Sequence, residues 1–287
     1  MLKYIFVAWA VLCPGLFAAI SILTSTTDLA HFASKVGGDL VTVKALAKPN
    51  QDLHSIAPRP SWAYQARKAD TVIVIGMGLD VWMDNIIIAS KKKSIMKGEP
   101  GYIDASKDVI KHAIPTDIGM EHGHLHAEGN PHYWLSPKQA LHVVDTIANQ
   151  LATQFPDHAP TFKANAANYK KSLRQHIATW QHTLSTISPS LITYHNTFDY
   201  FLRAFDLKLD TTIETKPGVP PTPRHLKFLQ DTLLEDRIHA VISAKYYPKK
   251  HLDFITKNTS IPAYQLPTST TTTYIDFINE IVTTLAK

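Results

Sequence analysis

Histidines that could bind a metal ion are concentrated in one part of this sequence. His122, His124, His126 and His132 fall within eleven residues, in the neighbouring segments EHGHLH and GNPHYWLSP. Neutral imidazole is a common zinc ligand, and alternating histidines in a short tract are typical of metal capture. A solvated polar loop has the same composition. The segment therefore leaves three alternatives open: a metal site, a metal-capturing loop or a polar turn.

Three histidines occupy equivalent places along the chain. His54 in NQDLHSIAP, His132 in GNPHYWLSP and His195 in LITYHNTFDYF each lie in a loop or at the carboxyl end of an expected strand, before an expected helix. In open α/β sheets, ligands bind beyond that edge of the sheet. Three imidazoles also leave the fourth position of tetrahedral zinc open. For one such histidine an ordinary polar residue is the better explanation, but the shared placement of all three favours a metal site.

The elements that must position these histidines alternate between strand and helix. In the first half of the chain the pattern predicts strands over 20–26, 40–46 and 70–76, and helices over 27–39, 61–69 and 137–155. The run DTVIVIG is apolar, as in strands buried within a parallel sheet. Residues 100–137 are predicted to be mostly loop. This alternation predicts an α/β fold with a mostly parallel sheet flanked by helices.

A second α/β unit is expected after one unusually long helix. The helix, predicted over 160–187, has some 28 residues and would span about 42 Å. The later pattern predicts strands over 190–195, 238–244 and 261–267, and helices over 197–205, 223–237, 249–258 and 273–286. We therefore expect a first lobe over 20–158, a connecting helix over 159–187 and a second lobe over 188–287. A site shared by His54 and His195 would lie in the cleft between the lobes.

The N-terminal segment predicts export from the cytoplasm. Residues 1–19 combine Lys3, an apolar run and small residues up to Ala19, which is the layout of a cleaved signal peptide. Cys13, the only cysteine, lies within this segment, so thiol chemistry and cysteine-type zinc sites are excluded from the mature chain. A lipid anchor would need a small residue before Cys13, where Leu12 stands. A periplasmic protein is therefore favoured over a lipoprotein.

The charge distribution argues against a nucleic-acid partner. The formal net charge is +5, and the densest basic run is KKK at 91–93. Nucleic-acid binders gather Lys and Arg on one face with interleaved aromatic residues. No such stripe occurs in this sequence.

Several motifs resemble one family of receptors. The segments TSTTDLAHFASKVGGDLVTVKAL, DLHSIAPRPSWAYQARKADTVIVIGMGLDVW, GNPHYWLSP and TYHNTFDYF are similar to the zinc/manganese-type (cluster A-I) solute-binding proteins of bacterial metal ABC importers, in order and spacing, from about residue 21 to the C-terminus. The resemblance implies two α/β lobes bridged by a long helix, with His54, His132 and His195 as ligands of a transported Zn²⁺. Mn²⁺ is the alternative cargo. The implied partner of this monomer is an ABC permease in the inner membrane.

The sequence departs from the family pattern in two places, directly before the first ligand and at the fourth ligand. The usual DPH reads DLH here, with Leu53, and QLPTSTTTTY offers no carboxylate before Asp276. Asp80, at an expected helix start, could supply an oxygen ligand, or it could simply favour the helix dipole. Glu214 and a water molecule are further candidates.

The alternative class of function is a secreted zinc hydrolase. Three histidines and a water also form a catalytic zinc site, which needs a general base beside that water. The chain has no HExxH helix and no paired carboxylates near the three histidines. We therefore predict a receptor rather than an enzyme. Because manganese prefers more oxygen ligands, we predict zinc.

Overall fold

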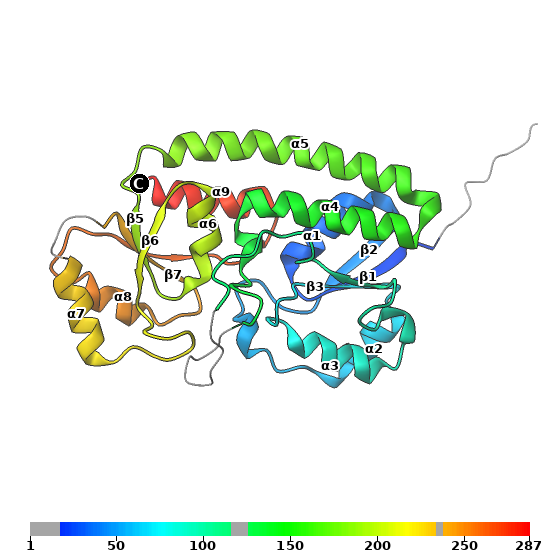
Figure 1. Cartoon of the computed structure of the whole chain (residues 1–287), viewed down its shortest axis with the longest axis horizontal. Helices are drawn as coiled ribbons and strands as arrows, with labels where there is room; N and C mark the ends of the chain where they lie inside the picture. The colour runs from blue at the N-terminus through cyan, green and yellow to red at the C-terminus, as the bar shows by residue number, and fades with distance from the viewer. Residues whose placement is uncertain (1–17, 116–125, 234–237) are drawn as a thin grey trace, which may run out of the picture.

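The protein consists of two α/β lobes bridged by one long helix, as a computed structural model describes for residues 18–115, 126–233 and 238–287. The lobes lie side by side along the longest axis of the molecule, and helix α5 (Ala159–Leu184) runs across both (Figure 1). Residues 1–17 of the expected signal segment 1–19 lie outside the described residues. In the described ranges no helix is both long enough and apolar enough to cross a membrane.

The first lobe is built on a parallel four-stranded sheet in the order β2-β1-β3-β4. Its strands are β1 (Ile20–Thr24), β2 (Val41–Ala45), β3 (Thr71–Val74) and β4 (Tyr102–Asp104). Its helices are α1 (Thr27–Gly37), α2 (Pro60–Lys68), α3 (Val81–Ser90) and α4 (Pro137–Gln154). Every residue of β3 is buried, as the apolar run at 70–76 predicted.

The second lobe repeats this topology with a parallel sheet in the order β6-β5-β7-β8. Its strands are β5 (Ser190–Thr193), β6 (Lys208–Thr212), β7 (Ala240–Ala244) and β8 (Ala263–Leu266). Its helices are α6 (Asp199–Ala204), α7 (Pro223–Leu233), α8 (Lys249–Ile255) and α9 (Tyr274–Leu285). The predicted fold class, two lobes with parallel sheets and a bridging helix, is confirmed.

Two strands were not expected from the sequence, and both are edge strands. β4 has three residues, and β6 carries the half-exposed sequence KLDTT. Three residues are too few to show an alternation, and KLDTT contains a single apolar residue, so hydrophobic patterning reveals neither strand. The region 100–137 is therefore not loop throughout, because it begins with β4.

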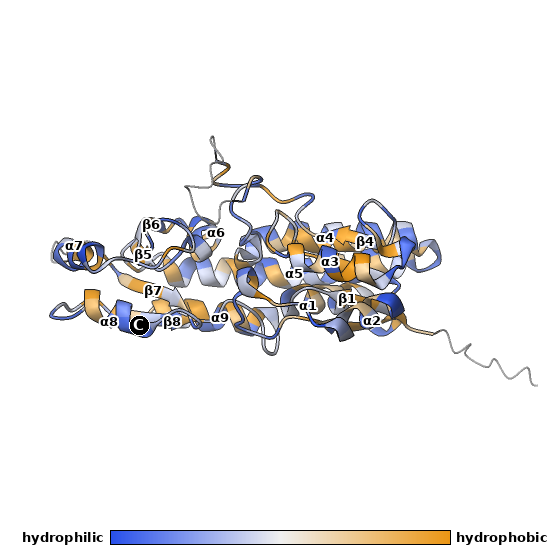
Figure 2. Ribbon diagram, turned by 90° about the horizontal axis from the view of Figure 1, so that it is seen from below, coloured by the Kyte–Doolittle hydropathy of each residue, from blue (hydrophilic) through white to orange (hydrophobic). Residues whose placement is uncertain are grey.

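One of the hydrophobic core clusters passes from one lobe into the other. Phe32 of α1 packs against Tyr274 of α9, with ring centroids 4.8 Å apart. The Tyr274 hydroxyl donates to the Trp134 carbonyl at 2.7 Å, and the Trp134 indole donates to the Thr268 carbonyl at 2.9 Å. Helices α4, α5 and α9 mix hydrophobic and hydrophilic residues along their length, as expected for helices with one buried face (Figure 2). The lobes are thus held together by shared packing as well as by α5.

Candidate metal centre

His54 stands in a short helical turn that follows β2. The turn η2 (Leu53–Ser55) is capped by Asp52, whose Oδ1 accepts a hydrogen bond from the His54 backbone N–H at 3.0 Å. The other oxygen of Asp52 accepts from the Ser55 hydroxyl at 2.9 Å. Because both carboxylate oxygens hold the turn, Asp52 fixes the backbone from which the His54 ring projects.

His132 is held by a compact turn between the loop and α4. The Asn130 side-chain oxygen accepts from the His132 backbone N–H at 3.0 Å, and the turn η5 (Tyr133–Leu135) follows at once. Tyr133 is fully buried, and its hydroxyl donates to the Ile75 carbonyl at 2.6 Å. Ser136 then caps the N-terminus of helix α4, and its hydroxyl accepts from the Gln139 N–H. His132 is therefore anchored on both sides by buried groups.

His195 follows β5 in the second lobe. The Thr193 hydroxyl donates to the His195 carbonyl at 2.6 Å and closes the turn into η7 (Asn196–Phe198). The His195 side chain is 6% exposed. The sequence-based placement of this residue at the carboxyl end of a strand matches the structure.

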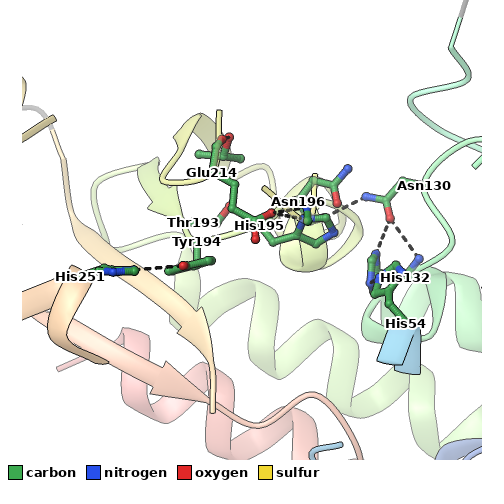
Figure 3. Close-up of polar contacts among 11 residues, drawn as sticks. His54, Asn130, His132, Thr193, Tyr194, His195, Asn196, Glu214 and His251 are labelled. Atoms are coloured by element: carbon green, nitrogen blue, oxygen red, sulfur yellow. Dashed lines mark hydrogen bonds and ion pairs between the residues drawn. The ribbon is translucent and has the colours of Figure 1, made fainter. Parts of the chain in front are cut away.

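The three imidazoles come together in the cleft between the lobes. One ring nitrogen from each of His54, His132 and His195 lies within 4.8 Å of the others. The Nε2 atoms of His54 and His132 are 3.3 Å apart. Two nitrogen ligands at 2.0–2.1 Å from a tetrahedral zinc ion are themselves about 3.3 Å apart. His54 and His132 thus already have the spacing of two zinc ligands, and His195 faces them from the second lobe (Figure 3).

Hydrogen bonds at Nδ1 leave Nε2 of two rings available to a metal. Nδ1 of His132 lies 2.7 Å from the Asn130 Oδ1, and Nδ1 of His195 lies 2.9 Å from the Glu214 Oε2. Glu214 is itself buried, and the same Oε2 accepts from the Gly218 N–H at 3.0 Å. An acceptor oxygen at Nδ1 favours the Nδ1–H tautomer, so the lone pair sits on Nε2. Carboxylates and carbonyls in this position also raise the basicity of a metal ligand.

Burial keeps the His132 ring neutral. The pKa of His132 is lowered well below its usual 6.5, first by burial and then by the neighbouring His54, His195 and His126. An imidazole must be neutral to donate a lone pair to a metal ion. His132 is therefore ready to ligate without losing a proton at neutral pH.

Asp80 is not brought to the three imidazoles. It is buried at the start of α3, and its two oxygens accept hydrogen bonds from the Ile75 N–H at 2.6 Å and the Gly76 N–H at 3.0 Å. Burial raises the pKa of this carboxyl to about 6. The carboxylate therefore closes its own β3–α3 turn. In the ranges that the structure describes, the group of candidate ligands contains only the three histidines.

The histidine-rich segment EHGHLH, for which a metal-capturing loop is one alternative, is described only at its end. His126 places its ring 5.2 Å from that of His54, measured between centroids. Its carbonyl accepts from the Gly129 N–H at 2.9 Å, so it belongs to the turn that leads to His132. His122 and His124 lie outside the described residues.

Aromatic side chains wall the site on two sides, with Trp134 beside His132 and Tyr194 next to His195. The ring centroids of Trp134 and His132 are 5.4 Å apart. Tyr194 stacks on Tyr247 with centroids 4.1 Å apart, and its hydroxyl lies 3.0 Å from Nδ1 of His251. Burial, and then Glu214, raises the pKa of Tyr194 to about 12. The cleft beside the imidazoles is thus lined by neutral aromatic groups.

Two residues that hold the ligands were not identified from the sequence. The sequence offers Glu214 as a candidate fourth ligand, and Asn130 is not among its candidates. Asn130 precedes Pro131 in GNPH, and an Asn-Pro pair is a turn signal whose side chain often bonds the backbone two residues on. That signal could have identified Asn130. Glu214 carries no comparable local signal, because its partner is 19 residues away.

Residues 22–287 match the family described as ZnuA, "Zinc-uptake complex component A periplasmic". The chain belongs to this family. Among its relatives, the "Iron-binding protein YfeA" of Yersinia pestis is 26% identical over 280 residues, covering 93% of this chain and 85% of the relative. The "Zinc-binding lipoprotein AdcA" of Streptococcus pneumoniae is 26% identical over 224 residues, covering 76% of this chain and 44% of the relative. This chain therefore aligns with less than half of AdcA.

Solved structures share the whole fold. A crystal structure of ZnuA superposes with a TM-score of 0.80 at 24% identity, covering 94% of this chain and 98% of that one. FpvC from Pseudomonas aeruginosa, in complex with Mn²⁺, superposes with a TM-score of 0.75 at 24% identity, covering 94% of this chain and 96% of that one. These likenesses bear out the two-lobe architecture.

Proposed function

We propose that this protein is a periplasmic receptor that binds one Zn²⁺ ion between its lobes and delivers it to an ABC importer. His54, His132 and His195 are the proposed ligands. The observation that carries the proposal is the meeting of three ring nitrogens within 4.8 Å, contributed by both lobes. The name of the family agrees with this function.

The donor set favours zinc over the other metals bound by similar proteins. Three imidazole nitrogens without a carboxylate suit Zn²⁺, whereas Mn²⁺ takes more oxygen ligands. Manganese and iron are the alternatives within the same family, since the names of FpvC and YfeA report Mn²⁺ and iron. A water molecule is the proposed fourth ligand, because Asp80 and Glu214 are both engaged in other hydrogen bonds.

The remaining parts of the proposal rest on the family and on the N-terminal sequence. We propose that residues 1–19 direct export and are removed, and that the mature protein is a periplasmic monomer. The proposed partner is the permease of a metal importer in the inner membrane. Among the described residues, Asp52 and Asp80 each hold a turn and Glu214 holds a ligand ring, which supports a receptor rather than a hydrolase.

Calorimetric titration of the metal-stripped mature protein with Zn²⁺, Mn²⁺ and Fe²⁺ tests this proposal. We expect one zinc ion per chain and weaker binding of the other two metals. Alanine at His54, His132 or His195 should lower zinc affinity by more than about 100-fold, beyond the 10–100-fold range of groups that only orient ligands. The matched control is His142→Ala, at an exposed position on α4.

Three results would count against the proposed site or function. Wild-type protein that binds no zinc would remove the function. Three alanine variants that bind zinc as tightly as the wild type would place the site elsewhere. Zinc-dependent cleavage of ester or peptide substrates by the wild type would favour the hydrolase.

A further inference from the structure

Asn130 connects the two lobes immediately beside the metal centre. Its side chain is 3% exposed and lies between the lobes. Its Oδ1 faces both the backbone N–H of His132, at 3.0 Å, and the ring Nδ1 of His132, at 2.7 Å. Its Nδ2 donates to the Asn196 carbonyl in the second lobe at 2.9 Å (Figure 3). Asn196 directly follows the ligand His195.

The orientation of the Asn130 amide follows from its backbone partners. A backbone N–H can only donate and a backbone carbonyl can only accept, so Oδ1 must face His132 and Nδ2 must face Asn196. With Oδ1 at His132, the ring Nδ1 must carry the proton. The lone pair of His132 then lies on Nε2, the atom 3.3 Å from Nε2 of His54. A carbonyl of the second lobe thus helps to select the tautomer of a ligand in the first lobe.

The hydrogen bonds that orient the His195 ring stay within the second lobe. Glu214, which bonds Nδ1 of His195, and Gly218, which bonds Glu214, both belong to the second lobe. That chain of bonds orients its ligand within one lobe. Asn130, by contrast, bonds a ligand ring in the first lobe and also bonds across the cleft.

We propose that Asn130 is a positioning residue that couples the metal-binding tautomer of His132 to the docking of the second lobe. The coupling deepens the proposed function and rests on it. A cation on Nε2 makes Nδ1–H a stronger donor to Oδ1, and this polarises the amide so that Nδ2–H bonds the Asn196 carbonyl more strongly. Docking here means the closed contact between the lobes that the Asn130–Asn196 bond helps to hold. Linkage is reciprocal, so if bound metal strengthens this contact by some factor, the contact must strengthen metal binding by the same factor.

Two substitutions separate the two halves of this role. Asn130→Asp keeps an acceptor for His132 but loses the donor to the Asn196 carbonyl. Asn130→Ala loses both bonds. Asn149→Ala, at an exposed position on α4, is the matched control.

The first readout is the tautomer of His132, from side-chain nitrogen shifts of histidine-labelled, metal-free protein. The second is amide exchange of residues 193–198 with and without Zn²⁺. We expect zinc to slow this exchange in the wild type and in the control. In Asn130→Asp the Nδ1–H tautomer should persist, but the zinc-induced slowing should be lost. In Asn130→Ala the tautomers should mix, and zinc affinity should fall by about 10–100-fold.

The coupling is overturned if zinc slows exchange in Asn130→Asp as much as in the wild type. It is equally overturned if Asn130→Ala keeps a single Nδ1–H tautomer and wild-type zinc affinity. Failure of the proposed function gives a different result, namely wild-type protein without zinc binding. The tautomer measurement on metal-free protein remains informative in that case.

Discussion

Replacing Asp28 with asparagine is expected to stabilise the protein at alkaline pH. Asp28 lies in the first turn of α1 and has no exposed surface. Its Oδ1 accepts from the Thr270 N–H of the second lobe at 2.9 Å, whereas its Oδ2 has no hydrogen-bond partner in the described part of the chain. Burial raises the pKa of this carboxyl from 3.8 to about 7. Asparagine keeps an oxygen for Thr270 and never becomes charged.

The size of the effect follows from proton linkage. Between pH 3.8 and about 7 the folded state keeps the Asp28 proton, while the unfolded state has released it. The free energy of unfolding of the wild type therefore falls as the pH rises through this window and stays low above it. About three pKa units at about 1.36 kcal/mol each correspond to a cost on the order of 4 kcal/mol. The Asp28→Asn substitution removes this cost, which is nearly absent at pH 4.

Urea denaturation of metal-free protein at pH 4.5, 6 and 8 measures this difference. The stability gained by Asp28→Asn should grow with pH up to about pH 7 and then level off. Asp39→Asn provides the control, because Asp39 is exposed near the end of the same helix. A gain that is equal at pH 4.5 and pH 8, or a loss of stability at pH 8, would show that the Asp28 charge is compensated in the folded protein.

Three further predictions concern the metal centre. Asp80→Asn should lower the free energy of unfolding by about 1–3 kcal/mol, because it loses an acceptor for a buried N–H, and should change the zinc dissociation constant little. A large loss of zinc affinity with unchanged denaturation would make Asp80 a ligand. Glu214→Gln should lower zinc affinity by about 10–100-fold in calorimetry without changing the expected stoichiometry of one zinc per chain. Unaltered affinity would contradict the role of Glu214 in orienting the His195 ring. Because the pKa of His132 is lowered below 6.5, the unfolded chain protonates this ring first, so metal-free protein should lose stability as the pH falls below 6.5. Denaturation between pH 5 and 7.5 should show a shallower slope in His132→Ala, and an unchanged slope would contradict the lowered pKa.

The central elements of the fold could be predicted because burial dictates their sequences. β3 must be apolar on both faces, and the run TVIV shows this directly. His195 could be placed for a related reason, since it closely follows the buried strand β5. His54 and His132 lie in loops, and their positions could be predicted only from their order between strands and helices. The edge strands β4 and β6 could not be predicted, because β4 has only three residues and β6, KLDTT, has one apolar residue and so no alternating pattern.

The roles of the carboxylates could not be derived from position along the chain. Asp80 stands at the ligand-facing edge of the first sheet, as expected, but its oxygens turn back to the N–H groups of Ile75 and Gly76. Glu214 lies on the far side of its imidazole, where it orients the ring. These roles depend on side-chain rotamers and on contacts between distant segments, which periodicity does not encode.

The core shared by the two lobes limits how the protein can be recombined. Helix α9 closes the second half of the chain, yet its Tyr274 packs on Phe32 of the first lobe and bonds Trp134 beside the metal centre. A chimaera that took its second half from a relative would therefore break an aromatic contact in the first half, even if the junction were placed within α5. Such an exchange must carry Phe32 and Trp134 with it, and in a calorimeter the intact chain should melt as one cooperative unit.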